Sequence, residues 1–379
     1  MTGPKKSLPE VDNNLGVLRQ KRGLSAAELA RTAEVTRQTI YAIEAGSYVP
    51  NTALALKLAR ALEVTVEDLF TLAGDSTAPD LRSETAAVLP GTPVPEPGQP
   101  VQLCRVDKRL FASSPSPVPW YFPASDAVVS AIPARGKAKV QVFHAEDTFR
   151  NRILVAGCDP AISVLAHNVL SAGIELVLAH RNSSQSLALL KEGFVHVAGT
   201  HLRDDSTGES NVSAIDKLFP RASVAVVSFA VWEEGVLTAR GNPKGIRGIE
   251  DFARADVRIV NRESGAGSRQ LLDAHLKRLG IPVRKVKGYD QEAQGHLPAA
   301  WQVQSGNADA CIATRASARA FGLGFLPLVS ERYDLVIRRE QMDSPGIQAL
   351  LDTLSRSSFR REIESLGGYD TRASGQRMR

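Results

Sequence analysis

The sequence has few cysteines, few aromatic residues and no long apolar run. Its 379 residues include 3 cysteines, and aromatic residues make up 6%. Cys104, Cys158 and Cys311 lie far apart, which excludes a disulfide framework and a CxxC metal pair. The longest uncharged apolar stretch, around Val224–Trp232, is much shorter than the ~20 residues of a membrane-spanning helix, and no apolar run follows the polar segment Met1–Glu10. These absences predict a cytoplasmic protein without a membrane segment or signal peptide.

The charge balance is also weak. The chain has 46 basic and 41 acidic residues, and its formal charge of +5 permits a nucleic-acid partner without indicating one. Hydrophobic residues make up 43% and charged residues 23%, which are ordinary globular values. At ~150 residues per domain, the length predicts two or three domains.

Changes in composition divide the chain into five regions. Residues 12–72 have the spacing of short amphipathic helices, and residues 73–100 are rich in Pro, Gly, Ser and Thr, which predicts a linker. A small β segment is expected at 101–150, a larger domain at 151–369 and a frayed basic tail at 370–379.

In the larger domain, short apolar runs alternate with helical patterns. This alternation predicts βαβ units and a mainly parallel sheet. Strands are expected at residues 153–157, 175–179, 195–198, 224–229, 257–260, 283–288 and 310–313, and helices at residues 160–170, 184–191, 271–279 and 297–303.

The N-terminal region carries the signals of an all-α domain of five helices. Ser25 and Glu28 have the spacing of a capping box, while Thr36 and Asn51 are expected to cap the third and fourth helices. Only residues 33–35 separate the second helix from the third, the length of the turn in a helix-turn-helix motif.

The third helix begins with polar side chains that suit DNA bases. Arg can pair with guanine and Gln with adenine in the major groove, while Arg19, Lys21, Arg22 and Arg31 are placed to neutralise phosphates. The predicted DNA-binding residues are Thr36, Arg37, Gln38, Thr39, Tyr41, Arg19, Lys21, Ser25 and Asn51.

The stretch LRQKRGLSAAELARTAEVTRQTIYAIEAGSYVP, followed by ALKLARALEVTVEDLF, resembles the Cro/lambda-repressor type of helix-turn-helix, the XRE family. This resemblance implies binding to double-stranded DNA. A single such domain covers one half-site, so a homodimer on a palindromic operator is expected. Where the family usually has a phosphate-contacting Gln, this chain has Ala26. A helical protein–protein module is the alternative for this region.

In the larger domain, polar residues follow several strands and open the next helices. Ligands of open α/β sheets bind at the carboxyl ends of strands, and helix N-termini there favour anions. In NRESGAGSR, two hydroxyls and two arginines flank flexible glycines, although the same turn could be only a helix cap. The predicted ligand-binding residues are Asp159, Asn182, Ser183, Ser184, Thr200, Arg262, Ser264, Gly265, Gly267, Ser268, Arg269 and Asp309.

The segments HVAGTHL, GNPKGI, NRESGAGSRQLLD, VKGYDQE and FLPLVSERYDLVI, with GNADA at 306–310, resemble the type II periplasmic-binding-protein-like domain. Its nearest relatives are fused to DNA-binding or molybdopterin-biosynthesis proteins. The resemblance implies an α/β domain of two lobes, residues 151–232 with the return from about 325 and residues 235–323, with the ligand clamped between them. Molybdate, tungstate or a molybdopterin-type compound is the first candidate ligand.

Other chemistry is expected to be absent. The seven histidines show no metal-ligand spacing, so no metal site and no cofactor are expected, and Cys158 is expected to be a buried packing residue. No nucleophile–base pair is visible, which favours a ligand-responsive transcription regulator over an enzyme. The alternative is an enzyme or binding protein of molybdenum-cofactor metabolism with an appended DNA-binding domain. A transporter component is disfavoured because no signal peptide is visible.

Overall fold

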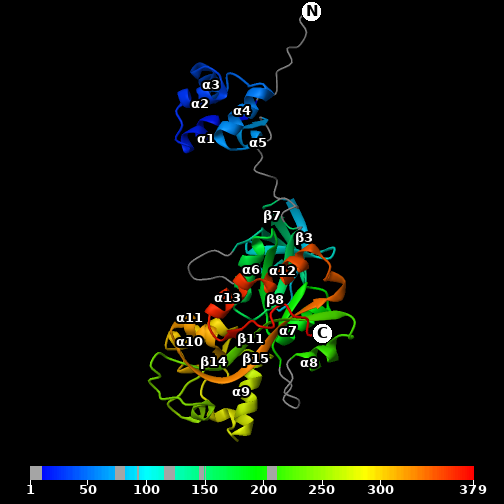
Figure 1. Cartoon of the computed structure of the whole chain (residues 1–379), viewed down its shortest axis with the longest axis vertical. Coiled ribbons are helices and arrows are strands. Elements are labelled where there is room, and N and C mark those ends of the chain that lie inside the picture. The colour runs from blue at the N-terminus through cyan, green and yellow to red at the C-terminus, as the bar shows by residue number, and fades with distance from the viewer. Residues whose placement is uncertain are drawn as a thin grey trace, which may run out of the picture. The chain divides into compact units, whose positions relative to one another are not determined.

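The structure, a computed structural model, describes residues 11–72, 82–91, 94–114, 124–144, 149, 151–202 and 211–379. The chain forms two compact units, Met1–Arg82 and Ser83–Arg379 (Figure 1). Among the described helices, none is both long and apolar enough to cross a membrane.

The first unit contains the five predicted helices. They are α1 (Leu15–Lys21), α2 (Ala26–Ala33), α3 (Arg37–Glu44), α4 (Thr52–Leu62) and α5 (Val66–Leu69), and strands β1 (Val11–Asn13) and β2 (Phe70–Leu72) pair antiparallel beside them. Ser25 and Glu28 form the predicted capping box, and Thr36 and Asn51 cap α3 and α4. Apolar residues at helical spacing, such as Leu29, Ile40 and Leu58, are fully buried in the core.

The second unit begins with a closed five-stranded barrel. Its strands are β3 (Arg82–Val88), β4 (Pro100–Val106), β5 (Arg109–Ser113), β6 (Ala127–Ala134) and β7 (Lys137–Val142). Strand β3 lies inside the segment 73–100 that was expected to be a linker. That expectation was wrong for residues 82–88, because the Pro-rich stretch that suggested it begins only after Val88.

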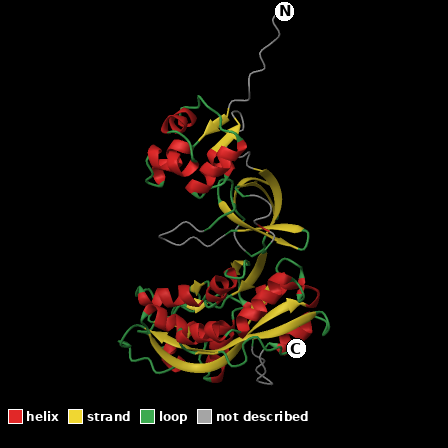
Figure 2. Ribbon diagram, turned by 45° about the horizontal axis from the view of Figure 1, so that its top comes forward, coloured by secondary structure: helices red, strands yellow, loops and turns green. Residues whose placement is uncertain are grey.

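A seven-stranded sheet forms the centre of the remaining chain. Its order is β14 (Ala310–Thr314), β11 (Val224–Thr238), β15 (Gly324–Arg338), β10 (Val197–Thr200), β8 (Arg152–Gly157) and β9 (Glu175–His180), with β16 (Tyr369–Asp370) paired to β11. Only the β10–β8 and β8–β9 pairs are parallel. The expected mainly parallel sheet was wrong because the long strands β11 and β15 run through both lobes and pair antiparallel along most of their length (Figure 2).

Lobe 1 surrounds the β9 side of this sheet. Its helices are α6 (Ile162–Leu170), α7 (Ser183–Lys191), α8 (Val212–Leu218), α12 (Pro345–Ser355) and α13 (Ser357–Ser365), and a 3-10 turn η4 spans Arg339–Gln341. Two apolar clusters cover opposite faces of its strands; one contains Val155 and Leu165, and the other contains Leu154 and Leu187.

Lobe 2 is inserted between β11 and β15 in the sequence. It contains η2 (Ile249–Ala253), β12 (Asn261–Arg262), α9 (Gly267–Arg278), η3 (Val283–Lys285), β13 (Glu292–Ala293), α10 (His296–Gln304), β14 and α11 (Arg315–Phe321). The strand expected at 283–288 was wrong, since a 3-10 turn occupies its start. At 257–260 the structure has one isolated bridge, Ile259–Ala310, and the Ile259 N–H also donates to the Lys287 carbonyl at 2.9 Å.

The C-terminal residues 370–379 are not frayed as expected. The Met378 N–H donates to the Val226 carbonyl at 2.8 Å, and the Gln376 carbonyl accepts from the Ser228 N–H at 2.9 Å. The tail therefore packs along β11 through main-chain hydrogen bonds, which the side-chain composition did not reveal.

Candidate DNA-binding and ligand-binding sites

Helix α3 presents its N-terminal polar residues to solvent. The Thr36 hydroxyl accepts from the Thr39 N–H at 3.1 Å, which caps the helix, and Arg37 and Gln38 are exposed. On the opposite side, Ile40 and Ile43 are fully buried. The predicted base-reading side chains are thus accessible to solvent, while the opposite face of α3 packs against the core of the domain.

Arg37 and Tyr41 form a pair on the exposed face. The Arg37 guanidinium donates to the Tyr41 hydroxyl from Nη2 at 2.8 Å and lies 5.2 Å from the ring centre. This contact holds the guanidinium near the start of α3.

Three of the other predicted DNA-binding residues, Arg19, Ser25 and Asn51, have structural partners. Arg19 donates to Glu44 at 2.6 Å and to the Leu24 carbonyl at 2.9 Å, and 12% of its side chain is exposed. It therefore joins α1 to α3, and its phosphate contact stays a prediction. Ser25 and Asn51 are helix caps, and the side chain of Lys21 lies outside the described residues.

The two lobes meet in a closed cleft. The Asn182 side chain donates to the Ser264 carbonyl of lobe 2 at 3.0 Å. A Cβ atom at Gly267 would lie 2.5 Å from Cε1 of His201, and one at Gly295 would lie 2.8 Å from Cε1 of His180. Glycine at these two positions thus permits the lobes to approach each other closely.

A cluster of polar and aromatic side chains is buried in this cleft, and we call it the interlobe site. It consists of Cys158, Asp159, His201, Trp232, Glu234, Arg262, Ser268, His296, Glu331 and Tyr333. Cys158, Asp159 and His201 follow strands of lobe 1, whereas Arg262, Ser268 and His296 belong to lobe 2. The remaining four lie on the crossing strands β11 and β15.

The rings of the interlobe site pack against one another. The Trp232 ring centre lies 4.7 Å from that of His201, 5.0 Å from that of His296 and 5.1 Å from that of Tyr333. Trp232 is 1% exposed. Its indole is therefore positioned to report on any opening of the cleft.

Two buried carboxylates contact these rings. Nδ1 of His201 and a carboxylate oxygen of Glu331 are 2.9 Å apart, and the Ser268 hydroxyl donates to Glu234. Nδ1 of His296 lies 3.9 Å from Glu234. Glu234 lies on β11 and Glu331 on β15, the two strands that run through both lobes. Glu331 contacts His201 of lobe 1, and Glu234 contacts Ser268 of lobe 2.

Burial and neighbouring charges shift the pKa values of this cluster. Burial raises the pKa of Asp159 to about 6 and that of Glu234 to about 7, with the nearby Glu331 adding to the rise at Glu234. Burial also lowers the pKa of His296 well below its ordinary value. For His201, burial lowers the pKa, but Cys158 and Glu331 favour the charged ring more strongly, so its pKa lies well above its ordinary value.

Several polar atoms in this cluster have no hydrogen-bond partner. They are Oδ2 of Asp159, Nε2 of His201, Nε1 of Trp232, Oε2 of Glu234, Nη1 of Arg262 and both ring nitrogens of His296. A buried polar atom without a partner costs about 1–3 kcal/mol of stability. So many in one place indicate a site that a polar ligand completes.

The predicted ligand-binding residues divide into two groups. Asp159, Asn182, Arg262, Gly267 and Ser268 come together at the cleft, and Ser264 and Gly265 contact Asn182 there. The Ser183 hydroxyl accepts from the His201 N–H at 2.9 Å and so positions that residue. The helix-cap alternative does not hold for the serines, because the N-cap of α9 is Ala266 and makes no side-chain cap.

Four predicted residues lie elsewhere. Ser184 is exposed on α7, and Thr200 bonds Asn211 within lobe 1. Arg269 pairs with Glu292 and donates to the Arg262 carbonyl at 3.1 Å, while Asp309 accepts from the Arg258 N–H at 2.8 Å. None of these four residues belongs to the interlobe site.

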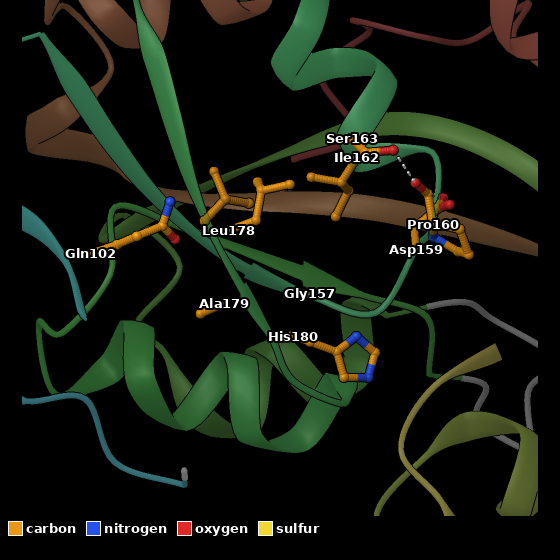
Figure 3. A pocket seen from close by; sticks show the side chains of 10 residues that line it. Gln102, Gly157, Asp159, Pro160, Ile162, Ser163, Leu178, Ala179 and His180 are labelled. Atoms are coloured by element: carbon orange, nitrogen blue, oxygen red, sulfur yellow. Dashed lines mark hydrogen bonds between the residues drawn. The ribbon is translucent and has the colours of Figure 1, made fainter. Parts of the chain in front are cut away.

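An open pocket of about 280 Å³ adjoins the cleft on lobe 1 (Figure 3). Gly157 and His180, at the ends of β8 and β9, line it together with Gln102 of the barrel strand β4. Asp159 belongs both to this pocket and to the interlobe site. The pocket therefore borders the buried cluster at Asp159.

Sequence reasoning missed most of the interlobe site. His201 and His296 have no recognisable spacing in the sequence, and Cys158 was expected only to pack. The one available signal was the placement of Glu234 between the apolar stretch that ends at Trp232 and the apolar residues Val236 and Leu237. A buried strand rarely carries an unpaired carboxylate, so this position pointed to polar partners.

Comparisons with known proteins agree with this organisation. Residues 17–69 match a helix-turn-helix family and residues 166–355 the PBP superfamily domain. The uncharacterized protein YvgK of Bacillus subtilis is 32% identical over 246 residues, which is 64% of this chain and 79% of YvgK. The uncharacterized HTH-type transcriptional regulator YgzD of the same organism is 47% identical over 60 residues, 16% of this chain and 91% of YgzD.

Solved structures with a similar fold share little sequence. The periplasmic molybdate-binding protein of Azotobacter vinelandii has a TM-score of 0.47 and 15% identity, covering 57% of this chain and 98% of its own. A substrate-binding protein with bound phosphate from Clostridium perfringens has a TM-score of 0.45 and 13% identity, with the same coverage of both chains.

Proposed function

Because the chain belongs to the PBP superfamily and carries an N-terminal helix-turn-helix domain, we propose that it is a transcription regulator whose DNA binding responds to a small ligand enclosed between its two lobes. The observation that carries this proposal is the set of unpartnered polar atoms in the closed cleft. The geometry of α3, with Arg37 and Gln38 exposed over a buried apolar face, supports the DNA-binding part.

The regulatory mechanism follows from a population shift. A ligand changes an equilibrium only by its different affinities for the two states. Residues from both lobes form the interlobe site, so a ligand there contacts all of them only when the lobes are closed. We expect the closed state to differ from the open state in its affinity for operator DNA.

The assembly on DNA is part of the proposal. One helix-turn-helix domain of this type covers a single half-site, and dimers span half-sites about 34 Å apart. We therefore propose a homodimer on a palindromic operator. Sedimentation of the full chain with and without selected DNA tests it; a monomer protecting one half-site would contradict it.

An anionic ligand, with molybdate and tungstate as the first candidates, is the class that the sequence predicted. Nη1 of Arg262 and Nε1 of Trp232 support it as free donors, and the N-terminus of α9 reaches the cleft at Gly267. Glu234 and Glu331 oppose it, because buried carboxylates repel a further negative charge unless a cation accompanies the anion.

The experiment measures whether a ligand at the interlobe site changes DNA binding by the helix-turn-helix domain. Operator fragments selected from random DNA by the full-length protein are titrated by fluorescence anisotropy, with candidate ligands present or absent. The proposal requires that operator affinity change on ligand addition and that Glu234→Gln reduce this change. Arg221→Gln, at an exposed position far from the cleft, is the control that should keep it. If no ligand that binds in the cleft changes operator affinity, the proposed function is overturned.

A further inference from the structure

Three metal-binding side chains converge inside the interlobe site. The ligand atoms of Cys158, His201 and His296 all lie within 4.8 Å of one another, and all three residues are buried. A second trio, His201, Glu234 and Glu331, meets the same distance limit. His201 belongs to both trios, so its imidazole lies next to Cys158 and His296 and also next to Glu234 and Glu331.

The unpartnered atoms on these residues are the ones that bind metals. Both ring nitrogens of His296, Nε2 of His201 and Oε2 of Glu234 lack a hydrogen-bond partner although their side chains are fully buried. Packing alone would not leave this many ring and carboxylate atoms without partners. Imidazole, thiolate and carboxylate are together a donor set that transition-metal ions bind in proteins.

The contacts around His201 orient it as a metal ligand. Its Nδ1 faces Glu331 at 2.9 Å. In the metal-bound state His201 is neutral: Nδ1 keeps its proton and donates to this carboxylate, and loss of the Nε2 proton frees a lone pair for the metal. Carboxylates commonly orient ligating histidines in this way. Cys158 is also held in place, because its main-chain N–H donates to the Tyr333 hydroxyl at 3.1 Å.

We propose that the interlobe site binds a divalent transition-metal ion of the zinc, cobalt or nickel class through Cys158, His201 and His296, with Glu331 positioning His201. This inference rests on the proposed function in one respect, that the effector occupies the cleft. Thiolate with imidazole selects such ions over magnesium and calcium, which prefer oxygen. Binding releases the Cys158 thiol proton and the Nε2 proton of His201 to solvent, and Glu234 or an exogenous group completes the coordination.

The position of the ligands explains how an ion would act. Cys158 and His201 belong to lobe 1, whereas His296 begins α10 of lobe 2. A bound ion thus bridges the lobes and stabilises the closed state. In a tetrahedral site, bonds of ~2.0–2.3 Å set ligand atoms ~3.5 Å apart. Because the ligand atoms already lie within 4.8 Å of one another, the side chains need to move together by at most about 1 Å.

Cobalt titration of the full-length protein, after removal of metals with a chelator, tests the proposal. A thiolate-bound cobalt ion gives a near-ultraviolet charge-transfer band. We expect this band in the wild type and its loss in Cys158→Ser. Cys104→Ser is the matched control, because Cys104 is a buried cysteine whose pKa burial raises to about 12. A second variant, Cys158→Ala, covers the case in which the serine variant does not fold.

Affinity measurements test the two histidines and the positioning role. His296→Asn should weaken cobalt binding by more than the 10- to 100-fold that is typical of losing a supporting residue. Glu331→Gln should weaken cobalt binding by no more than about 10- to 100-fold and should keep the charge-transfer band. Circular dichroism of each metal-free variant checks that it is folded.

Other outcomes overturn the proposal. No cobalt or zinc binding would overturn it, as would a charge-transfer band that persists in Cys158→Ser. If molybdate or tungstate raises the melting temperature and metal ions do not, the site binds an oxyanion and the proposed regulatory function still stands. If cobalt binds with the expected band but no ligand alters operator affinity, the metal site stands and the proposed function fails.

Discussion

The side-chain amide of Asn182 donates a hydrogen bond across the cleft to the main-chain carbonyl of Ser264, with a distance of 3.0 Å. The same side chain caps α7 by accepting from the Gln185 N–H. Asn182→Ser should keep the cap, since serine is an equally good N-cap residue, but serine is too short to reach lobe 2. With such bonds worth about 0.5–1.5 kcal/mol, the closed-to-open ratio should fall roughly 2- to 13-fold.

Acrylamide quenching of Trp232 measures this opening. Trp120→Phe and Trp301→Phe leave Trp232 as the sole tryptophan of the full-length protein, and its quenching should increase in the Asn182→Ser variant. The control is Asn168→Ser, because the amide of Asn168 bonds only residues of lobe 1, Val164 and Glu362. Equal quenching in both variants would contradict a role for Asn182 in closure.

A second prediction concerns operator recognition. Arg37→Ala and Gln38→Ala should each lose about 1–3 kcal/mol of specific operator binding, because each side chain can read a base from the start of α3. Lys21→Ala should weaken binding to all sequences alike and reduce the salt slope by about 1. Anisotropy titrations at several salt concentrations distinguish the two behaviours. Unchanged operator affinity in both α3 variants would mean that another surface reads the DNA.

A third prediction separates two serines of the loop before α9. Ser268→Ala removes the hydroxyl that donates to buried Glu234, so it should reduce any ligand-induced rise in melting temperature. Ser264→Ala alters an exposed side chain and should leave that rise intact. Calorimetric scans with zinc, molybdate, tungstate, sulfate and phosphate compare the two. Equal ligand responses in the two variants would remove this loop from the site.

A fourth prediction concerns acid stability. Nδ1 of His196 accepts from the Leu154 N–H at 3.0 Å, and burial lowers the pKa of His196 to about 4. The folded protein thus keeps His196 neutral while the unfolded chain binds a proton below about pH 6.5. Stability from this residue is full above pH 6.5 and is lost as the pH falls from 6.5 to 4.

Denaturant unfolding at pH 7 and pH 5 measures this effect. Between pH 7 and pH 5, the free energy of unfolding of His196→Gln should fall by on the order of 1–2 kcal/mol less than that of the wild type. His167→Gln, at an exposed position on α6, is the control. A wild-type pH dependence in the His196 variant would show that other groups cause the loss.

A fifth prediction concerns the joint between the barrel and the sheet. Arg152 of β8 donates to Asp126 at 2.7 Å and to the Leu103 carbonyl of β4 at 2.9 Å, and 6–7% of each charged side chain is exposed. Arg152→Met alone should cost about 3–5 kcal/mol, because it leaves a buried carboxylate unpaired. Adding Asp126→Asn should recover much of this loss, since Asn can still accept from the Leu103 N–H. Unfolding free energies of the wild type, the two single variants and the double variant give the coupling energy.

The sequence by itself determined the N-terminal domain almost completely. Ser25 with Glu28, Thr36 and Asn51 act within three residues of their partners, and the apolar periodicity of these helices is local. Helix signals of this kind depend on neighbours in the chain, so they can be recognised without knowing the tertiary structure. In the two lobes, α6, α7, α9 and α10 were predicted for the same reason, whereas α8, α11, α12 and α13 were not.

Only the tertiary structure decided the sheet order, the barrel and the interlobe site. His201 and Glu331 are 130 residues apart in the sequence, and Cys158 and Tyr333 are 175 apart. Residues so distant leave no spacing pattern, because their contact depends on β11 and β15 crossing between lobes. The loop before α9 was found from its composition, but its partners across the cleft were not. Their meeting is a property of how the two lobes close, which no local signal records.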